Sequence, residues 1–262
     1  MSERFAFPLH IQLPKMDVDS AEFEDLLGLL QREGFSGVEL NLERFDDPEG
    51  LQKKLGRFGL RLSMVASGAY AVAHGLSLSS ADEAVRLRAV AAVREMRAFA
   101  GALDAGVICG FIKGAAKENH DAAAAQFKMS LDELAGAGAP VYIEATNHYE
   151  AALVNTLDEG AGFVYGLAGL RVLPDTYHMN IEERGTAPAL TRHFGLYENL
   201  HLSDNNRRFP GFGAIDFRAV YGQLAALGYA GVTAVEGRAH SLRADITACA
   251  AYLESCSRGI CV

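Results

Sequence analysis

Residues 172–183 read VLPDTYHMNIEE, in which a short apolar run leads into Asp175. The second half of the chain repeats this arrangement in VYIEATNHYE at 141–150, LHLSDNNRRFPGFGAIDF at 200–217 and VTAVEGRAH at 232–240. In each stretch, an apolar run rich in β-branched residues or leucine ends on or near an acidic or imidazole side chain. Buried parallel strands have this composition, and functional groups collect at their carboxyl ends. The four stretches therefore predict parallel strands of an α/β fold.

The whole chain contains eight apolar runs of this kind, which predict strands at 7–13, 37–42, 60–66, 107–111, 140–144, 170–175, 199–203 and 231–236. Segments with apolar residues at three- and four-residue intervals predict helices at 21–33, 80–100, 122–135 and 217–227. Eight strands that alternate with helices form a closed parallel barrel, and a (β/α)8 TIM barrel of about 250 residues is a normal single domain. We therefore expect residues 1–262 to form one TIM-barrel domain.

Two predicted turns between a helix and a strand share a glycine pattern, GFSGVEL at 34–40 and GYAGV at 228–232. Gly34 and Gly228 are expected to end their helices in the left-handed conformation that glycine tolerates. This repetition supports a repeated βα architecture. Residues 158–170 are rich in glycine and only weakly periodic, so they give a poor helix prediction.

The formal net charge of −9 argues against a nucleic-acid-binding surface, because such a surface normally needs a basic stripe that displaces counterions. No apolar stretch approaches the roughly 20 residues of a membrane span. Residues 1–7, MSERFAF, lack the organisation of a signal peptide. We therefore expect a cytoplasmic protein that binds neither nucleic acid nor a membrane.

The four cysteines indicate structural thiols and carry no functional signal. Cys109 lies in an apolar run, and Cys249, Cys256 and Cys261 lie near the C-terminus without a CxxC motif. Reduced thiols fit this pattern better than a zinc site or a disulfide.

Glu144, Asp175, His201 and Glu236 are candidate ligands of one divalent metal ion, because each is placed at or near the end of a different predicted strand. Taken alone, each has an ordinary structural explanation, such as a salt bridge, a turn cap or a packed histidine. Their joint placement favours a metal site. Three carboxylates and one imidazole without thiolates suit Mn²⁺ best, and Co²⁺, Mg²⁺ or Zn²⁺ also fit.

A metal held by four protein ligands can keep open positions for a chelating substrate. A hydroxy-ketone could occupy those positions, with its carbonyl polarised by the metal as a Lewis acid. Removal of a proton next to the carbonyl then becomes feasible, because the resulting enediolate charge develops against the cation. The sequence therefore favours a metal-assisted enzyme.

The chain resembles the xylose isomerase-like TIM-barrel superfamily, and within it the group of D-tagatose/D-psicose 3-epimerases and L-ribulose 3-epimerases. The resemblance runs from GFSGVEL to VEGRAH, and its most specific part includes DTYHMNIEE at 175–183 and HLSDNNRRFPG at 201–211. It implies that Glu144, Asp175, His201 and Glu236 bind the metal and that Glu144 and Glu236 are the catalytic acid/base pair. It also implies that Glu150, His178 and Arg207 bind the substrate.

The implied reaction is epimerisation at C3 of a free ketohexose or ketopentose. One of the two glutamates would remove the proton beside the ketone, and the other would return a proton to the opposite face of a cis-enediolate. His178 and Arg207 would hold the O1/O2 end of the sugar, and Glu150 would orient nearby hydroxyls or His178.

Other functions occur on the same scaffold, since a fold does not determine a reaction. The close alternatives are aldose–ketose or hydroxypyruvate isomerase and keto-inositol isomerase or dehydratase. A non-catalytic barrel that binds sugar and metal is a more distant alternative. An abasic-site endonuclease is disfavoured by the acidic charge and by the presence of only eight histidines.

The apolar wall of the sugar pocket is harder to assign, because the chain has no tryptophan. Phe7, Met64 and Phe111 lie in or near predicted strands and are candidates for this wall, although packing in the core explains each of them better. Soluble enzymes of this kind are often homo-oligomers such as dimers or tetramers, but no sequence feature identifies an interface.

Overall fold

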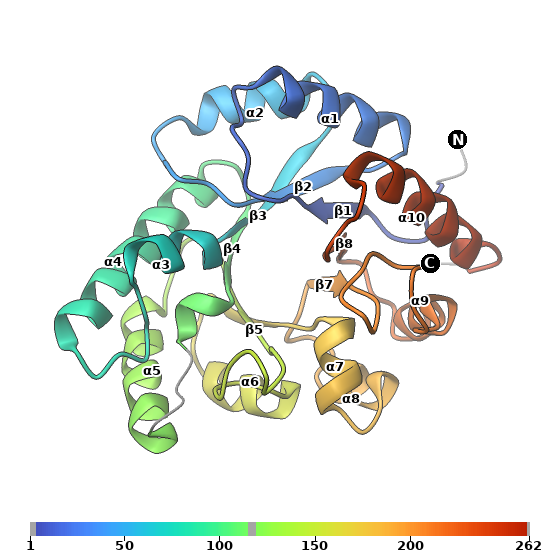
Figure 1. The fold of residues 1–262 in the computed structure, drawn as a ribbon. Helices are drawn as coiled ribbons and strands as arrows, with labels where there is room; N and C mark the ends of the chain where they lie inside the picture. Colours follow the sequence, from blue (N-terminus) through green and yellow to red (C-terminus); the bar gives the residue numbers. More distant parts are fainter. Residues whose placement is uncertain (1–3, 115–118, 261–262) are drawn as a thin grey trace.

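Eight parallel strands surround a central axis, and helices cover them on the outside (Figure 1). This computed structural model describes residues 4–114 and 119–260. Within these residues the strands are β1 (Leu9–Gln12), β2 (Gly37–Leu40), β3 (Arg61–Ala66), β4 (Gly106–Cys109), β5 (Val141–Glu144), β6 (Leu170–Leu173), β7 (Asn199–Leu202) and β8 (Val232–Val235). Each strand overlaps one of the eight predicted runs, and the (β/α)8 barrel is confirmed.

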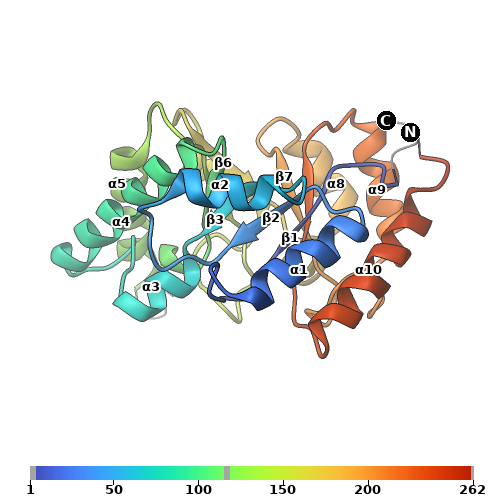
Figure 2. The same ribbon diagram turned by 90° about the horizontal axis from the view of Figure 1, so that it is seen from above.

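The helices alternate with the strands along the chain, and the view from above shows them flanking the sheet (Figure 2). They are α1 (Ala21–Arg32), α2 (Pro48–Gly56), α3 (Gly68–His74), α4 (Glu83–Gly101), the 3-10 helix η1 (Phe111–Lys113), α5 (His120–Leu134), α6 (Leu157–Val164), α7 (Thr176–Glu182), α8 (Thr186–Arg192), α9 (Phe217–Ala226) and α10 (Leu242–Ser257). The four predicted helices correspond to α1, α4, α5 and α9.

Neighbouring strands pair in chain order, and β1 pairs with β8, which joins the two ends of the chain. Between β6 and β7 the described ladder narrows to one parallel bridge between Asp175 and His201. The His201 N–H donates to the Pro174 carbonyl at 2.9 Å in this bridge. The barrel therefore closes at the point where two of the predicted metal ligands lie.

The hydrophobic core has two parts. A large cluster packs between the strands and the outer helices, and it includes Phe7, whose ring lies 5.4 Å from that of Tyr221. A smaller cluster fills one side of the barrel interior and consists of Met64, Ala66, Ile108, Tyr142 and Leu173. Phe7 and Met64 are therefore core residues, as their apolar surroundings in the sequence suggested.

Local features agree with most of the expectations from sequence. Gly34 and Gly228 adopt φ values of 82° and 68°, so both end their helices in the left-handed region as predicted. The poor helix prediction for residues 158–170 missed α6, which begins after Thr156, whose side chain accepts a hydrogen bond from the Glu159 N–H. This cap and the acidic first turn compensate for the glycines.

The cysteines at 109, 249 and 256 are buried and free within the described part of the chain. Burial raises the pKa of the Cys109 thiol to about 12, which makes it unreactive. Cys261 lies outside the described residues. In the stretches 4–114 and 119–260, no helix has the length and apolar character needed to cross a membrane.

Candidate metal centre

The four predicted metal ligands converge at the carboxyl ends of four adjacent strands. Glu144 is the last residue of β5, His201 lies in β7, and Glu236 directly follows β8. Asp175 lies two residues beyond β6 and begins α7, where its Oδ1 accepts a hydrogen bond from the Tyr177 N–H at 2.7 Å. One ligand atom from each of the four side chains lies within 4.8 Å of the others.

The imidazole of His201 points one nitrogen at the three carboxylates. Its Nδ1 lies 2.7 Å from a Glu236 oxygen, 3.8 Å from a Glu144 oxygen and 3.9 Å from an Asp175 oxygen. The guanidinium of Arg207 spans the outer side of the cluster, at 2.5 Å from both Asp175 and Glu236. Three carboxylates thus share one small buried volume, in which their mutual repulsion has to be offset by positive charge.

The residues of this cluster fit a divalent cation. Within the described residues, Glu144 Oε1 is buried and has no hydrogen-bond partner. A buried carboxylate oxygen is normally paired or bound to a metal, so this atom is available as a ligand. Oxygen ligands with one imidazole and no thiolate match Mn²⁺, Mg²⁺, Co²⁺ or Zn²⁺.

Both glutamates of the cluster have pKa values below the usual range. Burial raises the pKa of Glu236, but the charges of Arg207 and His201 outweigh burial and lower that pKa to about 2. Burial also raises the pKa of Glu144, and His201 and His178 together lower it by more. The two carboxylates are therefore ionised at neutral pH, the state required of a metal ligand or a general base.

The three predicted substrate-binding residues lie beside the cluster. His178 in α7 accepts a hydrogen bond at Nδ1 from the Asn147 N–H at 3.0 Å, so its Nε2 is directed toward Glu144 at 3.7 Å. The side-chain amide of Asn147 donates to Glu150 at 3.2 Å. Glu150, His178 and Arg207 line one cavity of about 500 Å³ together with Glu144 and Glu236. The structure therefore brings all seven predicted site residues to the same end of the barrel.

Comparison with known proteins gives the family. Residues 23–256 match the xylose isomerase-like TIM barrel. The chain belongs to this family.

Two characterised relatives of this xylose isomerase-like chain are sugar epimerases. The L-ribulose 3-epimerase of Mesorhizobium japonicum is 29% identical over 226 residues, which cover 80% of this chain and 73% of the relative. The 3-dehydro-D-guloside 4-epimerase of Escherichia coli strain K12 is 39% identical over 103 residues, 38% of this chain and 39% of the enzyme, so this match spans well under half of either protein.

The barrel also resembles solved structures. The crystal structure of an Escherichia coli 3-keto-D-glucoside 4-epimerase superposes with a TM-score of 0.79 at 21% identity, covering 95% of this chain and all of that one. At this level of identity the resemblance establishes the fold alone.

Two buried carboxylates near the cluster were not predicted from the sequence. Asp204 is fully buried in the loop after β7, where its carboxylate accepts hydrogen bonds from the N–H groups of Asn205, Gly211, Gly213 and Ile215 at 2.8–3.1 Å. This carboxylate shapes the loop that carries Arg207, whose φ of 60° is unusual for a residue with a side chain. The glycines after an aspartate in DNNRRFPGFG were the available signal.

Glu39 in β2 is the second missed residue. It is fully buried, and its Oε2 lies 2.9 Å from Nε2 of His201, on the side of the ring away from the cluster. The signal in the sequence was a charged residue inside the otherwise apolar GVEL strand.

Of the three candidates for the apolar wall of the sugar pocket, Phe111 is not the core residue that was expected. Phe111 was expected to pack in the core at the end of a strand, but β4 ends at Cys109 and Phe111 begins η1. Its side chain is 53% exposed and lines the cavity, because the turn at Gly110 directs it outward. Phe111 therefore lines the cavity beside the metal-ligand cluster, whereas Phe7 and Met64 are core residues.

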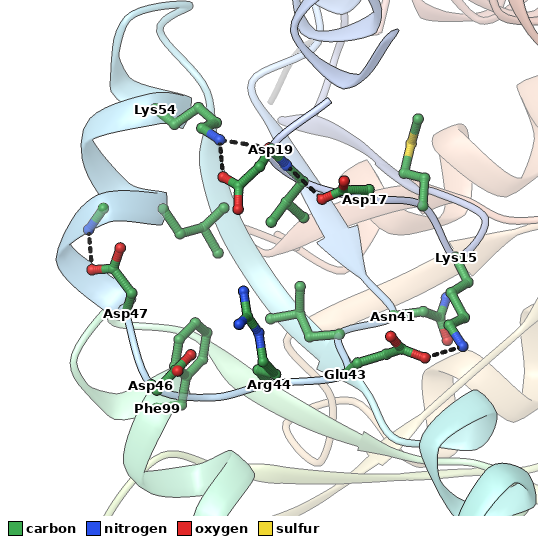
Figure 3. A pocket seen from close by; sticks show the side chains of 15 residues that line it. Lys15, Asp17, Asp19, Asn41, Glu43, Arg44, Asp46, Asp47, Lys54 and Phe99 are labelled. Atoms are coloured by element: carbon green, nitrogen blue, oxygen red, sulfur yellow. Dashed lines mark hydrogen bonds and ion pairs between the residues drawn. The ribbon is translucent and has the colours of Figure 1, made fainter. Parts of the chain in front are cut away.

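A second cavity, of about 650 Å³, lies beside the site in the loops after β1 and β2 (Figure 3). Four of its charged side chains form two ion pairs, Lys15 with Glu43, and Lys54 with Asp19 at 2.6 Å. Lys15, Glu43 and Asp19 in these pairs are exposed, so the cavity has the character of a solvated surface. It adds no chemical group to the metal centre.

Proposed function

We propose that this protein is a divalent-metal-dependent epimerase of keto sugars, and that its reaction is 3-epimerisation of free ketohexoses or ketopentoses. The convergence of Glu144 and Glu236 with Asp175 and His201, within 4.8 Å, is the observation that carries this proposal. The sequence similarity to an L-ribulose 3-epimerase and a 3-dehydro-D-guloside 4-epimerase supports epimerisation.

The two glutamates supply the acid/base chemistry. A bound divalent cation would polarise the substrate carbonyl and so acidify the neighbouring carbon. One of Glu144 and Glu236 removes the C3 proton as an ionised base, which gives a cis-enediolate of the sugar. The other glutamate, which is also ionised at rest, takes up a proton from solvent water and delivers it to the opposite face, and the first glutamate releases its proton to solvent. General acid–base catalysis of this kind accelerates a reaction by about 10²- to 10⁴-fold.

The neighbouring side chains position the sugar. His178 presents Nε2 to the cavity because Asn147 occupies its other nitrogen, and the same asparagine links it to Glu150. Arg207 is fixed between Asp175 and Glu236 and offers further guanidinium N–H donors. We assign His178 and Arg207 to the O1/O2 end of the ketose. Glu150 then orients His178 through Asn147.

A second candidate is 4-epimerisation of a keto-glycoside, and the 39% identity to the Escherichia coli 4-epimerase over 103 residues favours it. Both reactions invert a carbon next to a carbonyl through an enediolate. They differ in the position of the ketone and in whether the anomeric carbon carries a substituent. The same chain residues serve both reactions.

The test is proton exchange in D₂O followed by proton NMR. Free ketoses, methyl 3-keto-glycosides, hydroxypyruvate and keto-inositols are offered with Mn²⁺, Co²⁺ or Mg²⁺ in turn. We expect loss of the C3 proton signal of a ketose and the growth of its C3 epimer. Exchange at C4 of the glycosides alone identifies the second candidate, and conversion to an aldose identifies an isomerase. Thermal stabilisation by metal without exchange of any substrate contradicts an enzyme of this class and leaves a binding protein.

A further inference from the structure

Glu39 reaches His201 across the interior of the barrel. Strand β2, which carries Glu39, is separated from β7 by β1 and β8 in the order of the sheet. Its Oε1 accepts a hydrogen bond from the Asn199 side-chain amide at 3.0 Å, and its Oε2 lies 2.9 Å from His201 Nε2. Asn199 and His201 are two residues apart in β7, so both point to the same face of the strand. Glu39 thus forms hydrogen bonds with two successive inward-facing side chains of β7.

The direction of these hydrogen bonds determines which nitrogen of His201 faces the metal centre. A carboxylate accepts hydrogen bonds, so His201 Nε2 donates its N–H to Glu39. Nδ1 lies 2.7 Å from a Glu236 carboxylate oxygen, so without a metal it also donates an N–H. A divalent ion at the cluster would displace that proton and take the lone pair of Nδ1, while Nε2 keeps its N–H on Glu39. Nδ1 is the atom that faces Glu236, Glu144 and Asp175. A metal ion requires this lone pair.

We propose that Glu39 is a positioning residue, which fixes the tautomer and the ring orientation of His201 so that Nδ1 binds the metal. The inference rests on the metal site of the proposed function. A carboxylate that accepts the second N–H of a metal-binding histidine holds the ring in place and increases its basicity as a ligand, and the loss of such a partner typically weakens metal binding about 10- to 100-fold.

The packing of the barrel interior argues against a purely structural role. Removing a carboxylate from water is costly, and apolar side chains of similar volume often fill such positions at lower cost. Nearby interior positions on β3, β4 and β6 are filled in that way by Met64, Ile108 and Leu173, and Met64 is the register partner of Glu39. A buried glutamate is therefore less favourable for stability at this position than an apolar side chain. Its contact with the metal-facing histidine indicates a functional role.

The test is the affinity of the intact protein for Mn²⁺, measured by calorimetry for wild type and Glu39→Gln. A glutamine that keeps its oxygen on Asn199 turns its amide N–H₂ toward His201 Nε2. In that orientation the histidine must accept at Nε2 and carry its proton on Nδ1, the wrong atom for the metal. If the glutamine and Asn199 amides both flip, Nε2 donates to a neutral oxygen and the ring loses the charged acceptor that increases its basicity. We expect the dissociation constant for Mn²⁺ to rise about 10- to 100-fold. An unchanged constant in the folded variant overturns the proposal.

Two controls separate positioning from general damage. Ser130→Ala removes two other buried hydrogen bonds, from Ser130 to the Leu78 carbonyl and from Arg86 to Ser130, away from the barrel interior. It should lower the melting temperature and leave Mn²⁺ affinity unchanged. In a His201→Ala background, Glu39→Gln should weaken Mn²⁺ binding no further, because the two residues act as one unit. A further loss of equal size would refute the assignment.

Wild-type protein loaded with Zn²⁺ gives a measurement that requires no variant. In ¹⁵N NMR, His201 should retain its proton on Nε2 and lose it from Nδ1, and a proton on Nδ1 contradicts the proposal. If wild type binds none of these metals, the metal site of the proposed function fails together with this inference. If wild type binds and Glu39→Gln binds equally well, the role of Glu39 alone fails.

Discussion

Replacing Asp204 by asparagine should open the loop that carries Arg207 while the barrel stays folded. Asp204 Oδ1 accepts from Asn205 and Ile215, and its Oδ2 accepts from Gly211 and Gly213. Asparagine has nearly the same shape but only one acceptor oxygen. In either orientation its N–H₂ group therefore faces two backbone N–H donors, and two hydrogen bonds are lost.

The expected magnitude follows from those two bonds. A hydrogen bond to a charged group contributes about 1.5–3 kcal/mol, so the closed loop loses about 3–6 kcal/mol. This is a large part of the ~5–15 kcal/mol that stabilises a typical protein. A surface loop can open at a lower free energy than the whole domain, so we expect local opening rather than global unfolding. Each 1.4 kcal/mol is a tenfold change, which increases the open population at least about 100-fold.

Hydrogen exchange of the loop measured by mass spectrometry tests this prediction. Peptides within residues 204–217 should exchange at least about 100-fold faster in Asp204→Asn, and the exchange of β5 and β8 should change little. The matched control is Asp216→Asn, because Asp216 accepts one bond from the Ala219 N–H as the N-cap of α9. Asparagine caps helices as well as aspartate, so this variant should leave loop exchange unchanged. Unchanged exchange in Asp204→Asn would refute the view that this carboxylate organises the loop.

Three further predictions concern the site and the stability of the barrel. Glu236→Gln should reduce turnover at least about 100-fold and weaken Mn²⁺ binding by less, because an amide can coordinate a metal through its oxygen but cannot accept and release the transferred proton. Near-normal turnover in this variant would contradict the two-carboxylate mechanism. His178→Ala should raise KM and lower kcat, since it removes orientation as well as transition-state contact, and unchanged kinetics return His178 to a structural role. Burial, aided by the charge of Arg61, lowers the pKa of His10 from 6.5 to about 3. Between pH 7 and pH 5 the unfolded chain therefore binds a proton that the folded chain cannot bind, and wild type should lose about 2 kcal/mol of unfolding free energy that His10→Leu retains. Parallel pH dependence of the two proteins in urea titrations would show that His10 is not buried as a neutral ring.

The position of the candidate site could be predicted because parallel strands impose a simple rule. All carboxyl ends of a parallel barrel lie at one end, so polar residues that follow separate apolar runs must converge there. Glu144, Asp175 and Glu236 each follow or end such a run, and His201 lies in one. Their convergence, which the structure shows to be within 4.8 Å, could be predicted without knowledge of the loops or of helix packing.

Glu39 and Phe111 show where this reasoning stops. Glu39 and His201 are 162 positions apart and meet across the interior, which depends on the stagger of strands that are not neighbours. No local pattern records that stagger. Phe111 continues an apolar run, yet the chain leaves the strand two residues earlier and turns the ring outward. Hydrophobic periodicity identifies a strand but locates its end poorly. Here the strand ends two residues before Phe111, and this places the Phe111 side chain in the cavity and not in the core.

The apolar half of the cavity has a chemical consequence, although none of its residues titrates. Glu144, His178, Arg207 and Glu236 line one side, while the other side is formed by apolar residues of β3, α3, β4 and η1, namely Ala66, Ala69, Val72, Ala73, Ile108 and Phe111. A sugar has hydroxyl groups that suit the first side and carbon-bound hydrogens that suit the second, so an aliphatic wall can serve without tryptophan. When a substrate fills the space between the two sides, water is displaced from the carboxylates, and the loss of hydration disfavours their charged forms and makes them stronger bases. In the proposed reaction the base removes a carbon-bound proton. The apolar wall therefore contributes to the strength of that base as well as to the fit of the sugar.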